Sequence, residues 1–105
     1  MEQIQKIVNI GKYQARYAFE TIVENKTIFS RDNRFTSITF ENIGDTPAFI
    51  NGLIPCNNNG VVREFVELPN TTIHTDFTIT FDQNNMGTNP KILVVKTFYT
   101  KTEGE

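Results

Sequence analysis

The only histidine of the chain, His74, lies two residues before Asp76. Residues two apart on a β-strand project from the same face, so a hydrogen bond between imidazole and carboxylate is geometrically accessible. A catalytic role would also require an activated nucleophile held against the imidazole. The two serines, Ser30 and Ser37, are distant in sequence, and neither lies in a G-x-S-x-G context. We therefore interpret His74 as a solvated surface histidine.

A second polar stretch, 82-DQNNMG-87, has part of the spacing of a calcium-binding loop. An EF-hand takes oxygen ligands from its first, third and fifth positions and closes with a bidentate Glu at the twelfth. Here Met86 occupies the fifth position and Leu93 the twelfth, so the closing carboxylate is missing. We interpret the stretch as a long hairpin loop, and we predict no metal ion and no cofactor.

The single cysteine, Cys56, can form neither an internal disulfide nor a thiolate metal site by itself. We expect a small buried apolar residue there. The formal net charge of −2 provides no electrostatic footprint for nucleic acid. No phosphate-binding glycine motif and no recognisable pair of catalytic carboxylates is present. The sequence therefore predicts a protein that is not an enzyme.

The segment 31-RDNRF-35 combines cationic and aromatic side chains within five residues. Arg and aromatic residues are enriched at protein–protein hot spots, so Arg31, Arg34 and Phe35 are candidate interface residues. The alternative is a plain loop between strands, in which Asp32-Asn33 forms the turn and Phe35 begins the next strand.

Alternating apolar and polar residues predict several short β-strands. The clearest alternation lies in 73-IHTDFTITF-81, with one face made of Ile73, Thr75, Phe77, Ile79 and Phe81. The segment 36-TSITFEN-42 repeats the pattern more briefly. In 92-ILVVKTFY-99 both faces are apolar over the first half, which predicts a central strand.

The stretch 41-ENIGDTPAFINGLIP-55 places a short apolar run between turn residues. We predict one strand, which starts after Pro47 and is stopped by Pro55. Residues 13–24 fit a helix or a strand, and their aromatic and β-branched content favours the strand. Residues 1–12 are expected to form a short strand or an extended arm ahead of the domain at 13–105.

Strands at this spacing, with turn signals between them, predict an all-β fold: a single antiparallel β-sandwich of about seven or eight short strands. The residues expected to fill its core are Phe19, Ile38, Phe40, Ile50, Phe77, Ile79, Phe81, Val94 and Phe98.

The order of 35-FTSITFENIGDTPAFINGLIP-55, 73-IHTDFTITFD-82 and 89-NPKILVVKTFY-99 resembles small all-β virion structural proteins of bacteriophages that infect Bacteroidetes-type bacteria. The residues that carry the resemblance are Asn42, Gly44, Asp45, Pro47, Phe77, Ile79 and Phe81. The resemblance implies a jelly-roll-like sandwich in a capsid, a capsid decoration or a tail-associated part. It implies no catalytic residues.

The N-terminal segment lacks the pattern of a signal peptide, and no segment approaches the roughly 20 apolar residues that span a bilayer. We therefore expect a chain made and folded in a cytoplasm. The resemblance implies that this is the cytoplasm of a bacterial host and that the protein resides in the virion. The expected partners are other virion proteins and further copies of the chain, with no nucleic acid and no membrane. The alternatives are a small carbohydrate- or receptor-binding module, with Tyr13, Tyr17, Tyr99 and loop Phe residues as platforms, and a small enzyme.

Overall fold

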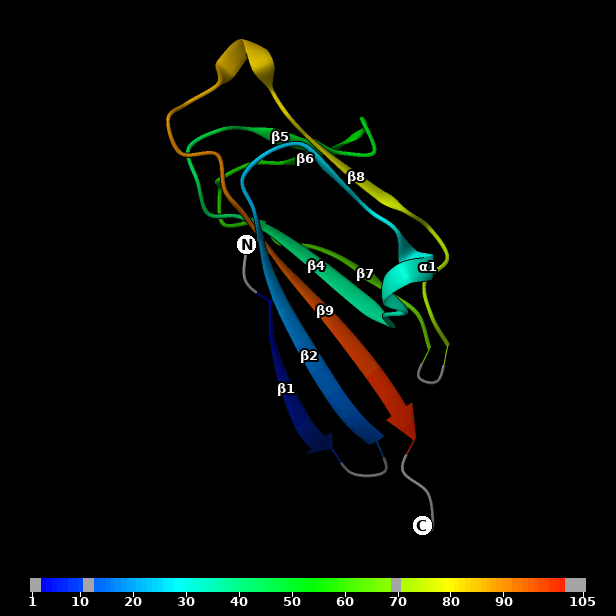
Figure 1. The fold of residues 1–105 in the computed structure, drawn as a ribbon. Helices are drawn as coiled ribbons and strands as arrows, with labels where there is room; N and C mark the ends of the chain where they lie inside the picture. The colour runs from blue at the N-terminus through cyan, green and yellow to red at the C-terminus, as the bar shows by residue number, and fades with distance from the viewer. Residues whose placement is uncertain (1–2, 11–12, 69–70, 102–105) are drawn as a thin grey trace.

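The computed structural model describes residues 3–10, 13–68 and 71–101, and within them it shows two antiparallel β-sheets (Figure 1). The five-stranded sheet has the spatial order β1 (Gln3–Ile10), β2 (Tyr13–Ile22), β9 (Ile92–Lys101), β4 (Ser37–Asn42), β7 (Arg63–Val66). The four-stranded sheet has the order β3 (Lys26–Ile28), β8 (Phe77–Phe81), β5 (Ala48–Ile50), β6 (Ile54–Cys56). Two short helices, α1 (Ser30–Asn33) and η1 (Gln83–Asn85), lie in connecting segments.

The strands pair in a nested order. The innermost pair is the β5–β6 hairpin, and it is enclosed in turn by the pairs β4–β7, β3–β8 and β2–β9. Two further pairings, β4–β9 and β5–β8, join these ribbons into the two sheets. The strand β1 is added at the edge of the larger sheet by a hairpin with β2. The predicted all-β, antiparallel class is thus confirmed, with nine strands among the described residues.

The core lies between the inner faces of the two sheets. Phe77 is its centre, with ring centroids of Phe65, Phe40 and Phe35 at 5.0, 5.5 and 6.2 Å from its own. Most of the predicted core is confirmed as buried: Ile38, Phe40, Ile50, Phe77, Ile79, Phe81 and Val94. Phe98 is partly buried and packs against this cluster.

Phe19 was wrongly predicted to belong to the core. It is only half-buried and lies outside the core cluster, whereas Ala18, Glu20 and Ile22 are the buried residues of this part of β2. The strand itself is confirmed over Tyr13–Ile22, and over residues 18–22 its inward face is the one that carries Ala18, Glu20 and Ile22. The error in the prediction arises at Glu20. A charged residue is rarely buried without a partner, so its presence in a sequence normally indicates the solvent-facing side of a strand.

Glu20 is buried because two lysines neutralise it. Its Oε1 lies 3.0 Å from the Nζ of Lys96 on the neighbouring strand β9, and its Oε2 accepts a hydrogen bond from Lys26 on β3. Burial alone would raise the pKa of Glu20, but the hydrogen bonds and charges of Lys26 and Lys96 outweigh it and lower the pKa below its ordinary value. The cluster ties the two sheets together.

The apolar run before Pro55 is a hairpin, not the single strand that was predicted. It consists of β5, a turn at residues 51–53, and β6 with Pro55 inside it. Asn51 and Gly52 have positive φ angles of 55° and 72°, which reverse the chain. Asn-Gly between apolar residues is a strong hairpin signal, and an edge strand such as β6 accommodates a proline.

The segment predicted as a strand over 73–81 is paired only over β8. Its antiparallel partner β3 ends with Ile28 opposite Phe77, so the preceding residues have no strand to pair with there. Ile73 stays buried in the core cluster, and its N–H donates to the carbonyl oxygen of Phe35 at 2.8 Å. Thr75 is exposed, which corrects its predicted place on the inward face.

The N-terminal residues 3–10 form the strand β1, while residues 11 and 12, at the expected boundary, lie outside the described residues. The strands β1, β2 and β9 run past the four-stranded sheet (Figure 1). They account for the elongated shape, with extents of 54 × 22 × 22 Å. The predicted central position of the last strand is confirmed, since β9 lies between β2 and β4.

Candidate functional site

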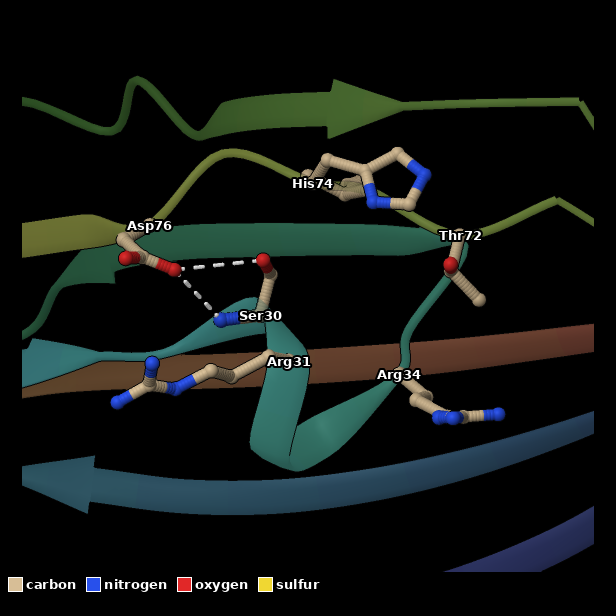
Figure 2. Close-up of a pocket in the computed structure, with 7 residues that line it drawn as sticks. Ser30, Arg31, Arg34, Thr72, His74 and Asp76 are labelled. Atoms are coloured by element: carbon tan, nitrogen blue, oxygen red, sulfur yellow. Dashed lines mark hydrogen bonds between the residues drawn. The ribbon is translucent and has the colours of Figure 1, made fainter.

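A pocket of about 470 Å³ opens beside α1 (Figure 2). Its wall comes from two segments that are far apart in the sequence: the α1 turn and the extended stretch that leads into β8. The lining residues are Ser30, Arg31, Arg34, Thr72, Ile73, His74 and Asp76. Three of these side chains are cationic or can become so, and we call this site the basic pocket.

The α1 turn is fixed to the opposite wall by Asp76. One carboxylate oxygen, Oδ1, accepts hydrogen bonds from the backbone N–H of Ser30 at 2.9 Å and from its hydroxyl at 3.3 Å. The turn closes at Arg34, whose N–H donates to the carbonyl oxygen of Ser30. Arg34 has a φ of 47°, a conformation that few non-glycine residues adopt. The two arginines are thereby held on either side of one tight turn.

The structure brings two of the three predicted interface residues to this pocket. Arg31 and Arg34 are both exposed and line it, with their guanidinium groups directed away from each other (Figure 2). Phe35 is fully buried against Phe77, so it supports the turn from the core instead of offering a surface. Arg31 also lies over the ring of Phe29, with 5.4 Å between the guanidinium carbon and the ring centroid.

Sequence reasoning did not place His74 and Thr72 beside the arginines. The link is the backbone hydrogen bond between Ile73 and Phe35, and no sequence motif announces such a long-range contact. His74 is exposed, as predicted. Its imidazole is turned away from the Ser30–Asp76 pair (Figure 2), so these three residues do not form a relay of nucleophile, base and orienting acid. The cationic side chains and the Thr72 hydroxyl that line the basic pocket could bind an acidic or polyhydroxylated group.

The loop that partly matches a calcium site is held by its own side chains. The carboxylate of Asp82 accepts from the N–H of Asn84 at 3.0 Å and from the side-chain amide of Asn85 at 2.8 Å. Within the described part of the chain, no three His, Cys, Asp or Glu side chains gather as a metal site would need.

Neither of the helices described is long and apolar enough to cross a membrane. Cys56 is buried, as predicted, and burial raises the pKa of its thiol.

The motif 42-NIGDTP-47, which carries much of the resemblance, forms a polar clamp at the far end of β4. Asp45 accepts hydrogen bonds from the backbone N–H groups of Asn89 and Thr88, each at 2.9 Å, and from the hydroxyl of Thr46. The bond from Asn89 is the main cause that lowers the pKa of Asp45. The buried amide of Asn42 donates to the carbonyl oxygens of Thr46 and Cys56 at 2.7 and 2.9 Å.

A second concave surface lies along β7. This groove has a volume of about 480 Å³ and is lined by Asn51, Glu64, Phe65, Val66, Glu67, Ile73, Thr75 and Phe77. Phe65 comes from the larger sheet, while Phe77 comes from the smaller one, so the groove marks the open side of the sandwich between the two sheets. We call it the β7 groove.

The chain was compared with protein-family models, with curated proteins and with solved structures. None of the three comparisons found a match.

Proposed function

We propose that this chain is a non-enzymatic virion structural protein: a component of a capsid, a capsid decoration or a tail-associated part. In this role it acts through repeated contacts with further copies of itself and with other virion proteins. The observation that carries the proposal is the nested pairing of its strands.

Nested pairing of this kind is what a jelly roll requires. A long antiparallel ribbon with β5–β6 at its tip is rolled so that its pairs alternate between two sheets. The orders β2-β9-β4-β7 and β3-β8-β5-β6 agree with that scheme, and β1 is an addition to it. Jelly rolls of eight strands recur in viral capsid and lectin domains, which favours a binding or assembly role over catalysis. One fold hosts several functions, so the choice among them also depends on the chemistry of the surface.

The surface chemistry also suits an assembly role. Arg31 and Arg34 stand on a rigid turn beside the exposed ring of Phe29, and Arg with aromatic neighbours is typical of binding hot spots. Large apolar side chains are exposed along the β7 side as well. We propose that Arg31 and Arg34 contact a neighbouring virion protein. The slightly negative net charge favours protein partners over nucleic acid or membrane.

A second candidate function is recognition of a carbohydrate or receptor, which the basic pocket favours. Its arginines, its histidine and the hydroxyl of Thr72 surround a cavity large enough for a sugar residue. An acidic glycan would match the charge of the pocket. A glycan array would test this: selective binding of acidic glycans that is lost in Arg34→Ala would favour recognition, and no binding would count against it.

The virion proposal is tested on purified particles of a phage whose genome encodes the chain. Quantitative mass spectrometry of gradient-purified particles should find the chain at a constant ratio to the other virion proteins. Detection in infected cells but not in particles would contradict the proposal. A host protein carried along by chance would show a ratio that falls with each purification step, which separates it from a true component.

A further inference from the structure

Among the described residues, the strand β7 forms one edge of the larger sheet and pairs with β4 alone. Around it, exposed large hydrophobic residues are concentrated. Among the nine such residues in the described parts of the chain, four lie between positions 61 and 68: Val61, Val62, Val66 and Leu68. Natural proteins normally protect an edge with charge, proline or covering loops. The charged residues Arg63 and Glu64 lie on β7 itself, but the large apolar side chains beside them stay exposed, which favours a partner at this edge.

The backbone groups of β7 that face outward can be assigned from its pairing with β4. The N–H of Glu67 donates to the carbonyl oxygen of Thr36, so Glu67 directs its backbone groups toward the β4 side. In an antiparallel ladder this orientation alternates along the strand. The backbone N–H and C=O groups of Phe65 therefore also face β4. Those of Glu64 and Val66 face the free edge. They are placed to bind a further strand.

We propose that the occupant of this edge is β7 of a second copy of the chain. The two strands run antiparallel across a two-fold axis and join two five-stranded sheets into one continuous sheet. The inward side chains of each copy then cover the apolar floor of the other copy's β7 groove, made by Phe65, Ile73 and Phe77. Such an interface is isologous, since the same patch is used on both copies.

Side-chain complementarity selects one register. When Phe65 lies on the axis, Arg63 of each copy is opposite Glu67 of the other. The same register sets Val62 opposite Leu68 and Glu64 opposite Val66. Opposite charges and apolar pairs directly across an antiparallel ladder are stabilising. Arg63 is already held at this open edge, because its Nε–H donates to the carbonyl oxygen of Pro55 at 2.8 Å.

The neighbouring registers lose this match. An axis on Glu64 would place the two Glu64 carboxylates opposite each other, which is destabilising. An axis on Val66 would place Phe65 opposite Glu67 and would separate the charged pairs. A register shifted by a single residue would place the inward side chains of one strand opposite the outward side chains of its neighbour.

This inference deepens the proposed function, because it names one surface for the repeated contacts of an assembly protein. The two can fail separately. A chain absent from particles would overturn the virion proposal and leave a β7 dimer intact. A chain present in particles but without β7 pairing would overturn only the inference.

The first test compares two charges at position 66. Val66 is 58 % exposed, so both Val66→Glu and Val66→Lys should fold, with thermal midpoints close to that of the wild type. In the proposed register, position 66 of each copy lies opposite Glu64 of the other copy. Val66→Glu therefore creates two pairs of opposed carboxylates in the dimer and should raise the dimer dissociation constant about tenfold or more. Val66→Lys faces the same carboxylates and should keep it within about threefold of the wild-type value.

The dissociation constants are measured by sedimentation equilibrium. Equal weakening by both substitutions, no effect of either, or a wild-type chain that is monomeric throughout would overturn the proposal.

A second experiment measures disulfide cross-linking between cysteine variants. Oxidation of a mixture of Glu64→Cys and Val66→Cys chains should give a mixed disulfide, since these positions lie opposite each other within disulfide range. Glu64→Cys alone should not cross-link, and efficient self-linkage at that position would overturn the register.

Discussion

The two ends of β4 use polar residues in opposite ways. Beyond its last residue, Asn42, the polar clamp uses the Asp45 carboxylate and the Asn42 amide in hydrogen bonds within the protein. Before its first residue, the α1 turn commits Asp76 to Ser30 but leaves the side chains of Arg34 and His74 exposed around a pocket. Both ends are rich in polar residues, so the difference lies in what those residues contact.

The difference separates motifs that stabilise the fold from surfaces that can bind. The N-x-G-D-x-P motif is conspicuous in sequence, but in space it closes one end of the sandwich. The basic pocket is less conspicuous, since its walls come from distant segments. A binding role is therefore better sought at the α1 end and along β7, and the following substitutions test that division from the largest expected effect to the smallest.

Both ends of β4 depend on the stable sandwich between them, and substitutions on opposite faces of β8, in the smaller sheet, should disturb that sandwich most severely. Ile79 is fully buried, whereas its neighbour Thr80 is exposed. Ile79→Asp should cost about 4 kcal/mol or more and unfold the domain, because it buries an unpaired carboxylate. Thr80→Asp should change the free energy of unfolding by less than about 1 kcal/mol. Urea denaturation measures both, and equal losses would contradict the strand register.

The buried ion cluster is the next most sensitive feature, and it lies inside the sandwich, away from both ends. Glu20→Gln keeps the shape of the side chain but removes the carboxylate that neutralises Lys96, itself 3 % exposed. We expect a loss of about 3 kcal/mol, since removal of one member of a buried ion pair is strongly destabilising. Glu24→Gln, at an exposed position two residues beyond β2, is the matched control and should cost less than about 0.5 kcal/mol. Similar losses for the two variants would show that the cluster does not stabilise the fold.

The clamp end can be broken by a single methyl group. A Cβ at Gly44 would overlap the backbone of Asn89 and Lys91. Gly44→Ala should therefore destabilise the protein by about 2 kcal/mol through overpacking. The control Asn57→Ala, at an exposed loop position, should be nearly neutral. If Gly44→Ala were equally neutral in thermal unfolding, the clamp would not be tightly packed.

The pH dependence of the unfolding free energy isolates the contribution of Glu20 to stability. Its pKa in the folded protein is lowered, so the stabilisation is complete above the ordinary Glu pKa of 4.5 and is lost as the pH falls below it, through the lowered value. The gap in unfolding free energy between wild type and Glu20→Gln should be constant above pH 4.5 and narrow below it. Asp45 also has a lowered pKa, but it is present in both proteins and cancels in the difference. A gap that stays constant down to strongly acidic pH would contradict the assigned ion pair.

The smallest effect on stability is expected at the α1 end. Arg34 is exposed, so Arg34→Ala should change the unfolding free energy by less than about 0.5 kcal/mol. Binding should respond instead: incorporation of the variant into particles should fall relative to wild type. A large loss of stability would show that Arg34 belongs to the fold, as the clamp residues do.

The sandwich was predictable from sequence wherever apolar alternation was regular. Over β8 and β4, the residues Ile79, Phe81 and Ile38 lie inward as the period of two requires. The prediction was wrong on β2, because a charged residue, Glu20, occupies the inward face and only its partners on other strands explain that. It was wrong over residues 48–54 because the Asn51-Gly52 hairpin signal was read as part of one strand.

The candidate surfaces were less predictable than the core. Arg31 and Arg34 were identified from composition, and both line the pocket. Their proximity to His74 depends on a contact between residues far apart in the sequence, which local patterns do not contain. The β7 edge was not foreseen, since whether a strand lies at an edge depends on the strand order and not on its own residues.

Self-association is the central claim of this account, and sedimentation velocity on the wild-type chain tests it most directly. The measurement should span a hundredfold range of concentration, roughly the span that separates a monomer from a fully formed complex. We predict a discrete species larger than the monomer whose fraction rises with concentration and falls in Val66→Glu. A single monomeric boundary at every concentration would contradict self-association through β7, and the virion proposal would then depend on the composition of purified particles.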